Sequence, residues 1–307
     1  MGLSKIHMGV NIAGIELRNP VATASGTFSF RDSGRFYDVS LLGAVTTKGV
    51  SAEPWEGNET PRIAESYGGM INSVGLENPG ACWYIEEELP VLKAFGVPVI
   101  ANAVGKSVTE YCRVVEMLGD SDVSMIEVNI SCPNVKQGGI GFGADARTAA
   151  ELTREVRKIA RKPLILKLTP NVTDICEIAK AVECEGADCI SLINTLLAMR
   201  IDAAARKPVL ANVFGGLSGP AVKPVALRMV YQVRRAVSLP IIGMGGIMSG
   251  EDAAEFLMAG ADAVAVGTAA LVNPTAPVDV LRGLERFMAE QGFDSIEALK
   301  GSFCGEA

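Results

Sequence analysis

Short apolar segments recur along the chain at the spacing expected when strands and helices alternate. Eight of them are continuously apolar, which is typical of strands buried on both faces of a sheet. Three begin at a Gly-Ala pair, whose glycine suits the end of a preceding helix. Three others begin at a proline, which is tolerated at the first residue of a strand. These predicted strands cover residues 21–25, 43–47, 98–102, 125–130, 163–168, 186–193, 240–244 and 260–266.

Segments with helical spacing of apolar residues separate most of these strands. Polar residues suited to helix N-termini precede three of them, at Thr148 (with Glu151 as a capping box), Thr173 and Ser249. Eight such β/α units predict a single TIM (β/α)8 barrel domain over residues 1–307. A doubly wound sheet would need Gly-x-Gly-x-x-Gly after its first strand, and this chain lacks that pattern there.

Three additions to the barrel are also expected from the pattern. Residues 10–18 predict an N-terminal hairpin at the bottom of the barrel. Long insertions follow strand 2 (residues 50–97, with a hairpin at 61–72) and strand 6 (residues 196–220). None of these reads as a linker between domains.

Composition and charge exclude several classes of protein. The chain has 307 residues, 49% of them hydrophobic, a formal net charge of −7 and a pI of about 5.0. No basic patch suggests nucleic acid, and no apolar run approaches the roughly 18 residues of a membrane span. The N-terminus has no apolar signal core, so we expect a cytoplasmic protein without membrane contact. The seven cysteines are scattered without a Cys-x-x-Cys pair, so we expect neither a disulfide framework nor a metal site.

The chemistry of a TIM barrel lies at the C-terminal ends of its strands. Those positions are rich in amides and glycines and include two lysines, Lys48 and Lys167. The glycine steps near Gly245 and Gly267 favour an anion site, in particular a phosphate, over simple tight turns. Because a buried lysine needs a partner and these strand ends offer no carboxylate, a bound anion such as a flavin N1/O2 edge is expected beside the lysines.

Cys132 is the strongest candidate for catalysis. It follows the strand at 125–130 and precedes the Gly-rich stretch 138–143. The single histidine, His7, lies within the first ten residues, so proton transfer must rely on other residue types or a bound cofactor. A thiol near pKa 8.5 needs only a modest shift to act as a base or nucleophile. The other six cysteines are better explained as packing residues.

Four longer motifs resemble one known family. They occupy residues 72–79, 129–139, 167–174 and 215–220 and together resemble the class 1 dihydroorotate dehydrogenases, specifically the catalytic subunits of the NAD-linked B type. The resemblance covers residues 10 to about 290. It implies oxidation of (S)-dihydroorotate to orotate in de novo pyrimidine biosynthesis, with FMN at the barrel mouth. Cys132 would remove the C5 proton while hydride from C6 passes to flavin N5.

The resemblance also assigns binding residues by motif. Substrate binding is implied for Lys48, Asn72, Ser73, Val74, Gly75, Leu76, Asn129, Asn194 and Thr195. FMN binding is implied for Ser25, Lys48, Gly49, Asn102, Asn129, Lys167, Ile193, Gly219, Gly245, Gly246, Gly267 and Thr268.

The partners implied by the resemblance carry the rest of the electron path. The expected assembly is a homodimer of this chain joined by two electron-transfer subunits that hold FAD and a 2Fe-2S cluster and reduce NAD. Alternatives are a fumarate-using A-type enzyme and a uracil or thymine reductase like dihydropyrimidine dehydrogenase. A non-redox phosphate-binding barrel and a non-catalytic binding protein are more remote.

Overall fold

The computed structural model describes residues 6–131, 141–300 and 302–304, and a closed barrel of parallel strands forms its centre. The barrel strands are β3 (Val21–Thr23), β4 (Val45–Val50), β7 (Val99–Ala103), β8 (Met125–Asn129), β9 (Leu164–Lys167), β10 (Cys189–Leu192), β15 (Ile241–Met244) and β16 (Ala263–Val266). Neighbours in the sheet follow chain order, and a parallel bridge between Ala22 and Ala44 joins β3 to β4. The predicted TIM-type barrel is confirmed.

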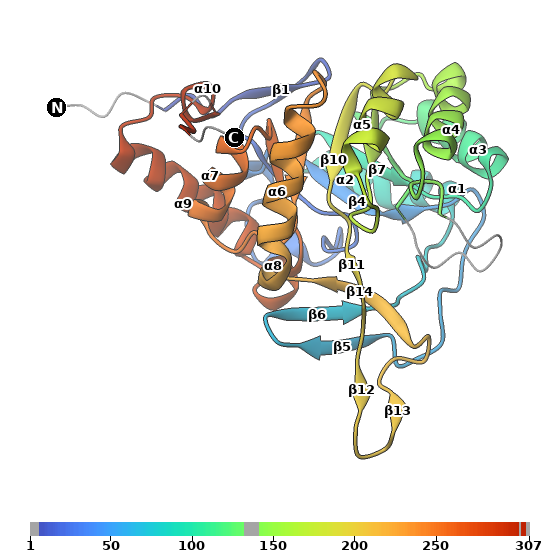
Figure 1. Ribbon diagram of the computed structural model, residues 1–307. Coiled ribbons are helices and arrows are strands. Elements are labelled where there is room, and N and C mark those ends of the chain that lie inside the picture. The colour runs from blue at the N-terminus through green and yellow to red at the C-terminus, as the bar shows by residue number, and fades with distance from the viewer. Residues whose placement is uncertain (1–5, 132–140, 301, 305–307) are drawn as a thin grey trace.

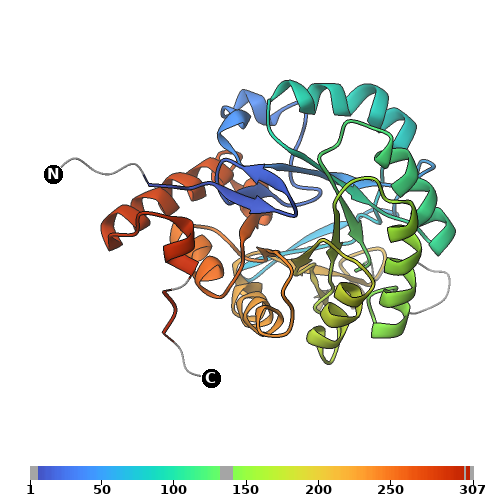
Figure 2. The same ribbon diagram turned by 90° about the horizontal axis from the view of Figure 1, so that it is seen from above.

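Helices surround the barrel, as Figure 2 shows from one end. They are α1 (Ala81–Trp83), the π-helix η3 (Tyr84–Glu88), α2 (Leu89–Ala94), α3 (Val108–Gly119), α4 (Ala146–Ile159), α5 (Ile175–Cys184), α6 (Lys223–Arg234), α7 (Gly250–Met258), α8 (Thr268–Val272), α9 (Ala276–Gln291) and α10 (Ile296–Lys300). Short 3-10 turns η1 (Ser33–Arg35), η2 (Val39–Leu41) and η4 (Pro220–Val222) complete the connections. Within the described ranges, no helix is long and apolar enough to cross a membrane.

The helix starts agree with the sequence at one of the three predicted positions. Ser249 caps α7 in a capping box with Asp252, as expected. The predictions at Thr148 and Thr173 were wrong. Helix α4 starts three residues earlier, where Asp145 accepts from the Thr148 amide, and α5 is capped by Asp174. At α5, the adjacent Thr173 and Asp174 both suit the N-cap position, and the carboxylate takes it. At α4, Asp145 is a strong capping residue one turn before Thr148.

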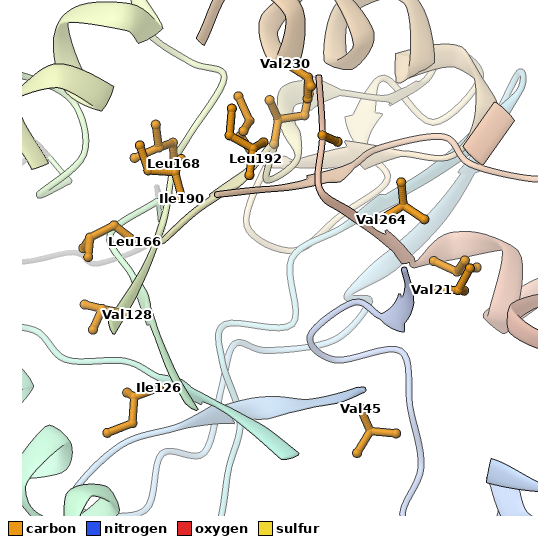
Figure 3. Packing of buried hydrophobic residues seen from close by; sticks show 14 of the residues in the cluster. Val21, Val45, Ile126, Val128, Leu166, Leu168, Ile190, Leu192, Val230 and Val264 are labelled. Atoms are coloured by element: carbon orange, nitrogen blue, oxygen red, sulfur yellow. The ribbon is translucent and has the colours of Figure 1, made fainter. Parts of the chain in front are cut away.

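Side chains of the barrel strands alternate between two apolar clusters. One lies between strands and helices, where Ile126, Val128 and Leu166 point outward from the barrel (Figure 3). The other lies inside, near the N-terminal ends of the strands, and includes Ile100, Met125, Ile165 and Cys189. Burial on both faces explains why the strands read as continuous apolar runs.

The predicted N-terminal hairpin closes the bottom of the barrel. Strands β1 (Val10–Ile12) and β2 (Ile15–Leu17) pair antiparallel. Ile12 and Leu17 are fully buried in the inner cluster, against the N-terminal ends of the barrel strands. The interior is therefore plugged by side chains at this end, and any cavity must open at the other.

The two long insertions build one small sheet outside the barrel, visible below it in Figure 1. Its strands are β5 (Ile63–Ser66), β6 (Gly69–Asn72), β11 (Leu196–Met199) and β14 (Phe214–Ser218), in the order β11-β14-β6-β5. A further hairpin, β12 (Ile201–Asp202) and β13 (Lys207–Pro208), extends from it. The 61–72 hairpin and both insertions were predicted, but the pairing of β6 with β14 was not.

Candidate active site

A cavity of about 320 Å³ lies between the C-terminal ends of the barrel strands and the small sheet. Strand ends form its floor, and Ile63, Met70 and Leu217 of β5, β6 and β14 form its cover. Because the hairpin β1–β2 fills the opposite end, the barrel opens toward this cavity alone in the part of the chain that the structure describes. This is where chemistry is expected in a TIM barrel.

Most of the residues predicted for substrate and cofactor line this cavity. They are Ser25, Lys48, Gly49, Asn72, Val74, Leu76, Asn129, Lys167, Ile193, Asn194, Thr195, Gly219, Gly245, Gly246, Gly267 and Thr268. These residues come from the C-terminal ends of seven of the eight barrel strands and from the segments that follow them. The structure brings them together, while their binding roles remain predictions.

Three predicted residues do not line the cavity. Ser73 is buried and accepts from the Asn58 side chain at its carbonyl, 3.0 Å away. Gly75 has a φ of +77°, and a Cβ there would lie 2.6 Å from the Asn58 side chain. These two residues hold the loop that presents Val74 and Leu76. Asn102 is fully buried one layer below the cavity floor. Cys132 lies outside the described residues.

The two strand-end lysines stand in different surroundings. Lys167 is 4% exposed, and its Nζ lies 3.4 Å from Oε1 of Glu127. Lys48 is half-buried, with its Nζ close to Gly26 at the end of β3. The expectation that Lys167 has no carboxylate partner was therefore wrong. The described lining of the cavity nevertheless contains both ammonium groups and no aspartate or glutamate, which favours an anionic ligand.

Glycines let the backbone approach the cavity at the ends of β15 and β16. Gly245 and Gly246 have φ values of +123° and +81°, which side chains rarely adopt. A Cβ on Gly246 would lie 2.8 Å from the Gly219 carbonyl oxygen, so the two connections pack closely. Thr268 Oγ1 lies 2.8 Å from Ser218 Oγ and ties α8 to β14. These features suit a phosphate group held by main chain and hydroxyls.

Amide side chains form a connected network across the floor. Asn129 Nδ2 lies 3.5 Å from Asn102 Oδ1, and Asn129 Oδ1 accepts from Ser131 Oγ at 2.6 Å. Asn194 Nδ2 in turn donates to Ser131 Oγ. Tyr111 of α3 donates to the Asn129 carbonyl at 2.6 Å and fixes the end of β8. The polar edges of a flat ring would therefore meet donors and acceptors that are already oriented.

Sequence reasoning missed Glu127 and Ser191, which lie beneath these amides. Both are inward-facing residues of β8 and β10 and are almost fully buried. Period-two spacing could have found them, because Glu127 stands two residues before Asn129 and so shares its face. The strands were interpreted as uniformly apolar, which hid the inner polar layer.

A known protein family matches nearly the whole chain. The sequence model of the family described as dihydroorotate dehydrogenase matches residues 7–288. The chain belongs to the dihydroorotate dehydrogenase family. This confirms the resemblance inferred from the motifs.

Several members of the dihydroorotate dehydrogenase family align along nearly their whole length. A relative from Alkaliphilus metalliredigens is 58% identical over 98% of this chain and 100% of its own. A relative from Lachnoclostridium phytofermentans is 55% identical over 96% of this chain and 99% of its own. A relative from Geobacter sp. (strain M21) is 53% identical over 98% of this chain and 99% of its own. Each is named dihydroorotate dehydrogenase B (NAD(+)), catalytic subunit.

Proposed function

We propose that this chain oxidises (S)-dihydroorotate to orotate in pyrimidine biosynthesis, as the catalytic subunit of an NAD-linked enzyme. The observation that carries the proposal is the cavity at the strand ends. Its described lining combines oriented amides, two lysines and no carboxylate, on a chain 58% identical to a named B-type catalytic subunit.

FMN fits the residues that are present. The glycine steps at Gly245 and Gly267, with Thr268, offer main chain and hydroxyl to a phosphate. Lys167 provides a buried cation on the floor, where a reduced flavin ring carries negative charge. When bound, FMN would supply the site that accepts a hydride.

The substrate is expected to bind between the floor and the small sheet. Lys48 would pair with the carboxylate of dihydroorotate, and Asn72, Asn129 and Asn194 would hold its ring amides. Asn72 is already oriented, since its Nδ2 lies 3.4 Å from the Gly216 carbonyl oxygen of β14. The cover of β5, β6 and β14 would exclude water from the reacting carbon atoms.

Cys132 is proposed to take the C5 proton as a general base. It directly follows Ser131, whose side chain contacts Asn129 and Asn194 at the cavity floor. This adjacency in the sequence to a residue of the amide network supports the assignment. General-base assistance of this kind contributes about 10²- to 10⁴-fold to a rate.

A second subunit is proposed to carry electrons from the flavin to NAD. The relatives are named as catalytic subunits, which implies another subunit in those proteins. We propose an assembly of two copies of this chain with two subunits that hold FAD and a 2Fe-2S cluster. Reconstitution with such a subunit should give dihydroorotate-dependent NADH formation, and this chain alone should give none.

A visible spectrum before and after anaerobic addition of dihydroorotate tests the proposed reaction. We expect a yellow protein whose flavin band bleaches. Bleaching by dihydrouracil but not by dihydroorotate would replace the proposal with a pyrimidine reductase. A colourless chain that takes up no FMN would exclude flavin chemistry altogether.

Cys132→Ala tests the proposed base. The variant should retain FMN yet lose about 10²- to 10⁴-fold in the rate of flavin reduction. Cys304→Ala is the matched control, because Cys304 is exposed near the C-terminus. Fast reduction in Cys132→Ala would show that another group takes the proton.

A further inference from the structure

Glu127 is a buried carboxylate in the polar layer directly beneath the cavity. It is 2% exposed and lies at the centre of β8, between the inward-facing Met125 below and Asn129 above. A charged group so far from water is costly unless it is paired and hydrogen-bonded. Glu127 is not among the residues that the motifs assign to substrate or FMN, so its burial needs its own explanation.

Three donors from three other positions around the barrel converge on this carboxylate. Asn102 Nδ2 of β7 lies 2.6 Å from Oε1, and Lys167 Nζ of β9 lies 3.4 Å from the same oxygen. Ser191 Oγ of β10 donates to Oε2 at 2.7 Å. Both oxygens are therefore occupied, and one of the donors is the cation expected beside the flavin.

The carboxylate also sets the direction of the amide network. An ionised carboxylate can only accept hydrogen bonds, so Asn102 must turn its Nδ2 toward Glu127. Its Oδ1 then faces Asn129 Nδ2, and Asn129 Oδ1 is left to accept from Ser131. The orientations of Asn102 and Asn129 thus both follow from the Glu127 carboxylate.

We propose that Glu127 is a positioning residue for the flavin site, which compensates the charge of Lys167 and fixes the orientation of Asn102 and Asn129. This inference rests on the proposed function for the identity of the cofactor. If it is right, the carboxylate sets how strongly Lys167 stabilises the reduced, anionic ring. A purely structural ion pair would influence folding and leave the flavin potential unchanged.

Glu127→Gln separates these roles, because it keeps the shape, removes the charge and adds a donor. In the FMN-loaded chain, the equilibrium between the flavin and a reference dye should shift at least tenfold toward reduced flavin. This corresponds to a rise of about 30 mV in the midpoint potential of the flavin for a two-electron couple. Glu127→Asp retains the charge and should stay near the wild-type potential. An unchanged or lowered potential in folded Glu127→Gln would overturn the proposal.

A second comparison serves if Glu127→Gln does not fold. Lys167→Met leaves the Glu127 charge uncompensated, whereas Lys167→Met combined with Glu127→Gln leaves a neutral pair, which the core accepts more easily. The flavin in Lys167→Met should be at least tenfold harder to reduce than in the double variant. Equal potentials in these two proteins would exclude an electrostatic role for Glu127.

The dye titration uses a chemical reductant, so it needs FMN but not dihydroorotate. A wild-type flavin that dihydroorotate fails to bleach would contradict the proposed reaction, while the dye shifts would still decide the role of Glu127. A chain that takes up no FMN would overturn both proposals.

Discussion

Glu88 gives the protein a predictable dependence of stability on pH. It is the last residue of the π-helix η3, and burial raises the pKa of its carboxyl from an ordinary value of 4.5 to about 7, although Arg31 opposes the rise. The folded protein therefore binds the proton more tightly than the unfolded chain does. The contribution of Glu88 to the free energy of unfolding is therefore greatest below about pH 4.5. This contribution is lost as the pH rises from there through about 7.

The magnitude follows from the two pKa values. One pKa unit corresponds to about 1.4 kcal/mol, so the rise from 4.5 to about 7 means that ionising Glu88 in the folded state costs at most about 3.5 kcal/mol. Because the side chain is only partly buried and keeps some contact with water, about 1–2 kcal/mol is expected. Glu88→Gln removes the ionisation and should raise the free energy of unfolding by this amount at pH 8 and by much less at pH 5.

Urea-induced unfolding of wild type and Glu88→Gln at both pH values checks the prediction. Glu87→Gln is the control, because Glu87 is exposed on the same helical segment. Glu87→Gln should change the stability by less than about 0.5 kcal/mol at either pH. An equal effect of Glu88→Gln at pH 5 and pH 8 would refute the linkage argument.

Three further predictions concern the scaffold around the site. Ile12→Ala should lower the free energy of unfolding by about 2–5 kcal/mol, because it opens a cavity in the plug at the bottom of the barrel, where Ile12 is fully buried. Gly250→Ala should cost about 1–3 kcal/mol or more, because its Cβ would lie 2.0 Å from the Gly283 carbonyl carbon of α9. Tyr111→Phe should cost about 1–3 kcal/mol, because the buried Asn129 carbonyl loses its 2.6 Å donor. Thermal and urea unfolding measure all three.

Each of these variants has a control on the same chain. Ile15→Ala changes a partly buried residue of the same hairpin and should cost less than Ile12→Ala. Gly119→Ala places its Cβ at ordinary contact distance, 3.7 Å from Arg161, and should be tolerated. Tyr67→Phe removes a fully exposed hydroxyl and should be silent. Equal losses in a variant and its control would contradict the packing or hydrogen bond named for it.

The barrel was predictable because its signals are local. Six of the eight predicted strands begin at a Gly-Ala pair or a proline, and polar residues stand near the strand ends, so both the order of strands and the location of the site follow from single segments. That is why residues as distant as Lys48 and Thr268 could be assigned to one cavity. Family motifs added the chemical roles that the pattern alone does not contain.

What escaped prediction depends on contacts between distant segments or on competition between neighbours. The pairing of β6 with β14 leaves no periodic signal in either insertion. Asp174 takes the cap that was predicted for the adjacent Thr173, and Asp145 starts α4 three residues before the predicted Thr148 cap. The partnership of Glu127 with Lys167 joins residues 40 apart in sequence, and burial on both strand faces concealed the alternation that would have shown it.

The small sheet over the cavity has a consequence for how the protein is made. Asn72 of β6 and Gly216 of β14 lie side by side but are 144 residues apart in sequence. During synthesis, the β5–β6 hairpin emerges long before its partner and presents an unpaired edge until β14 is available. Long-range strand pairing of this kind is slow and open to aggregation. The cover of the cavity therefore cannot be completed until β14 has been synthesised.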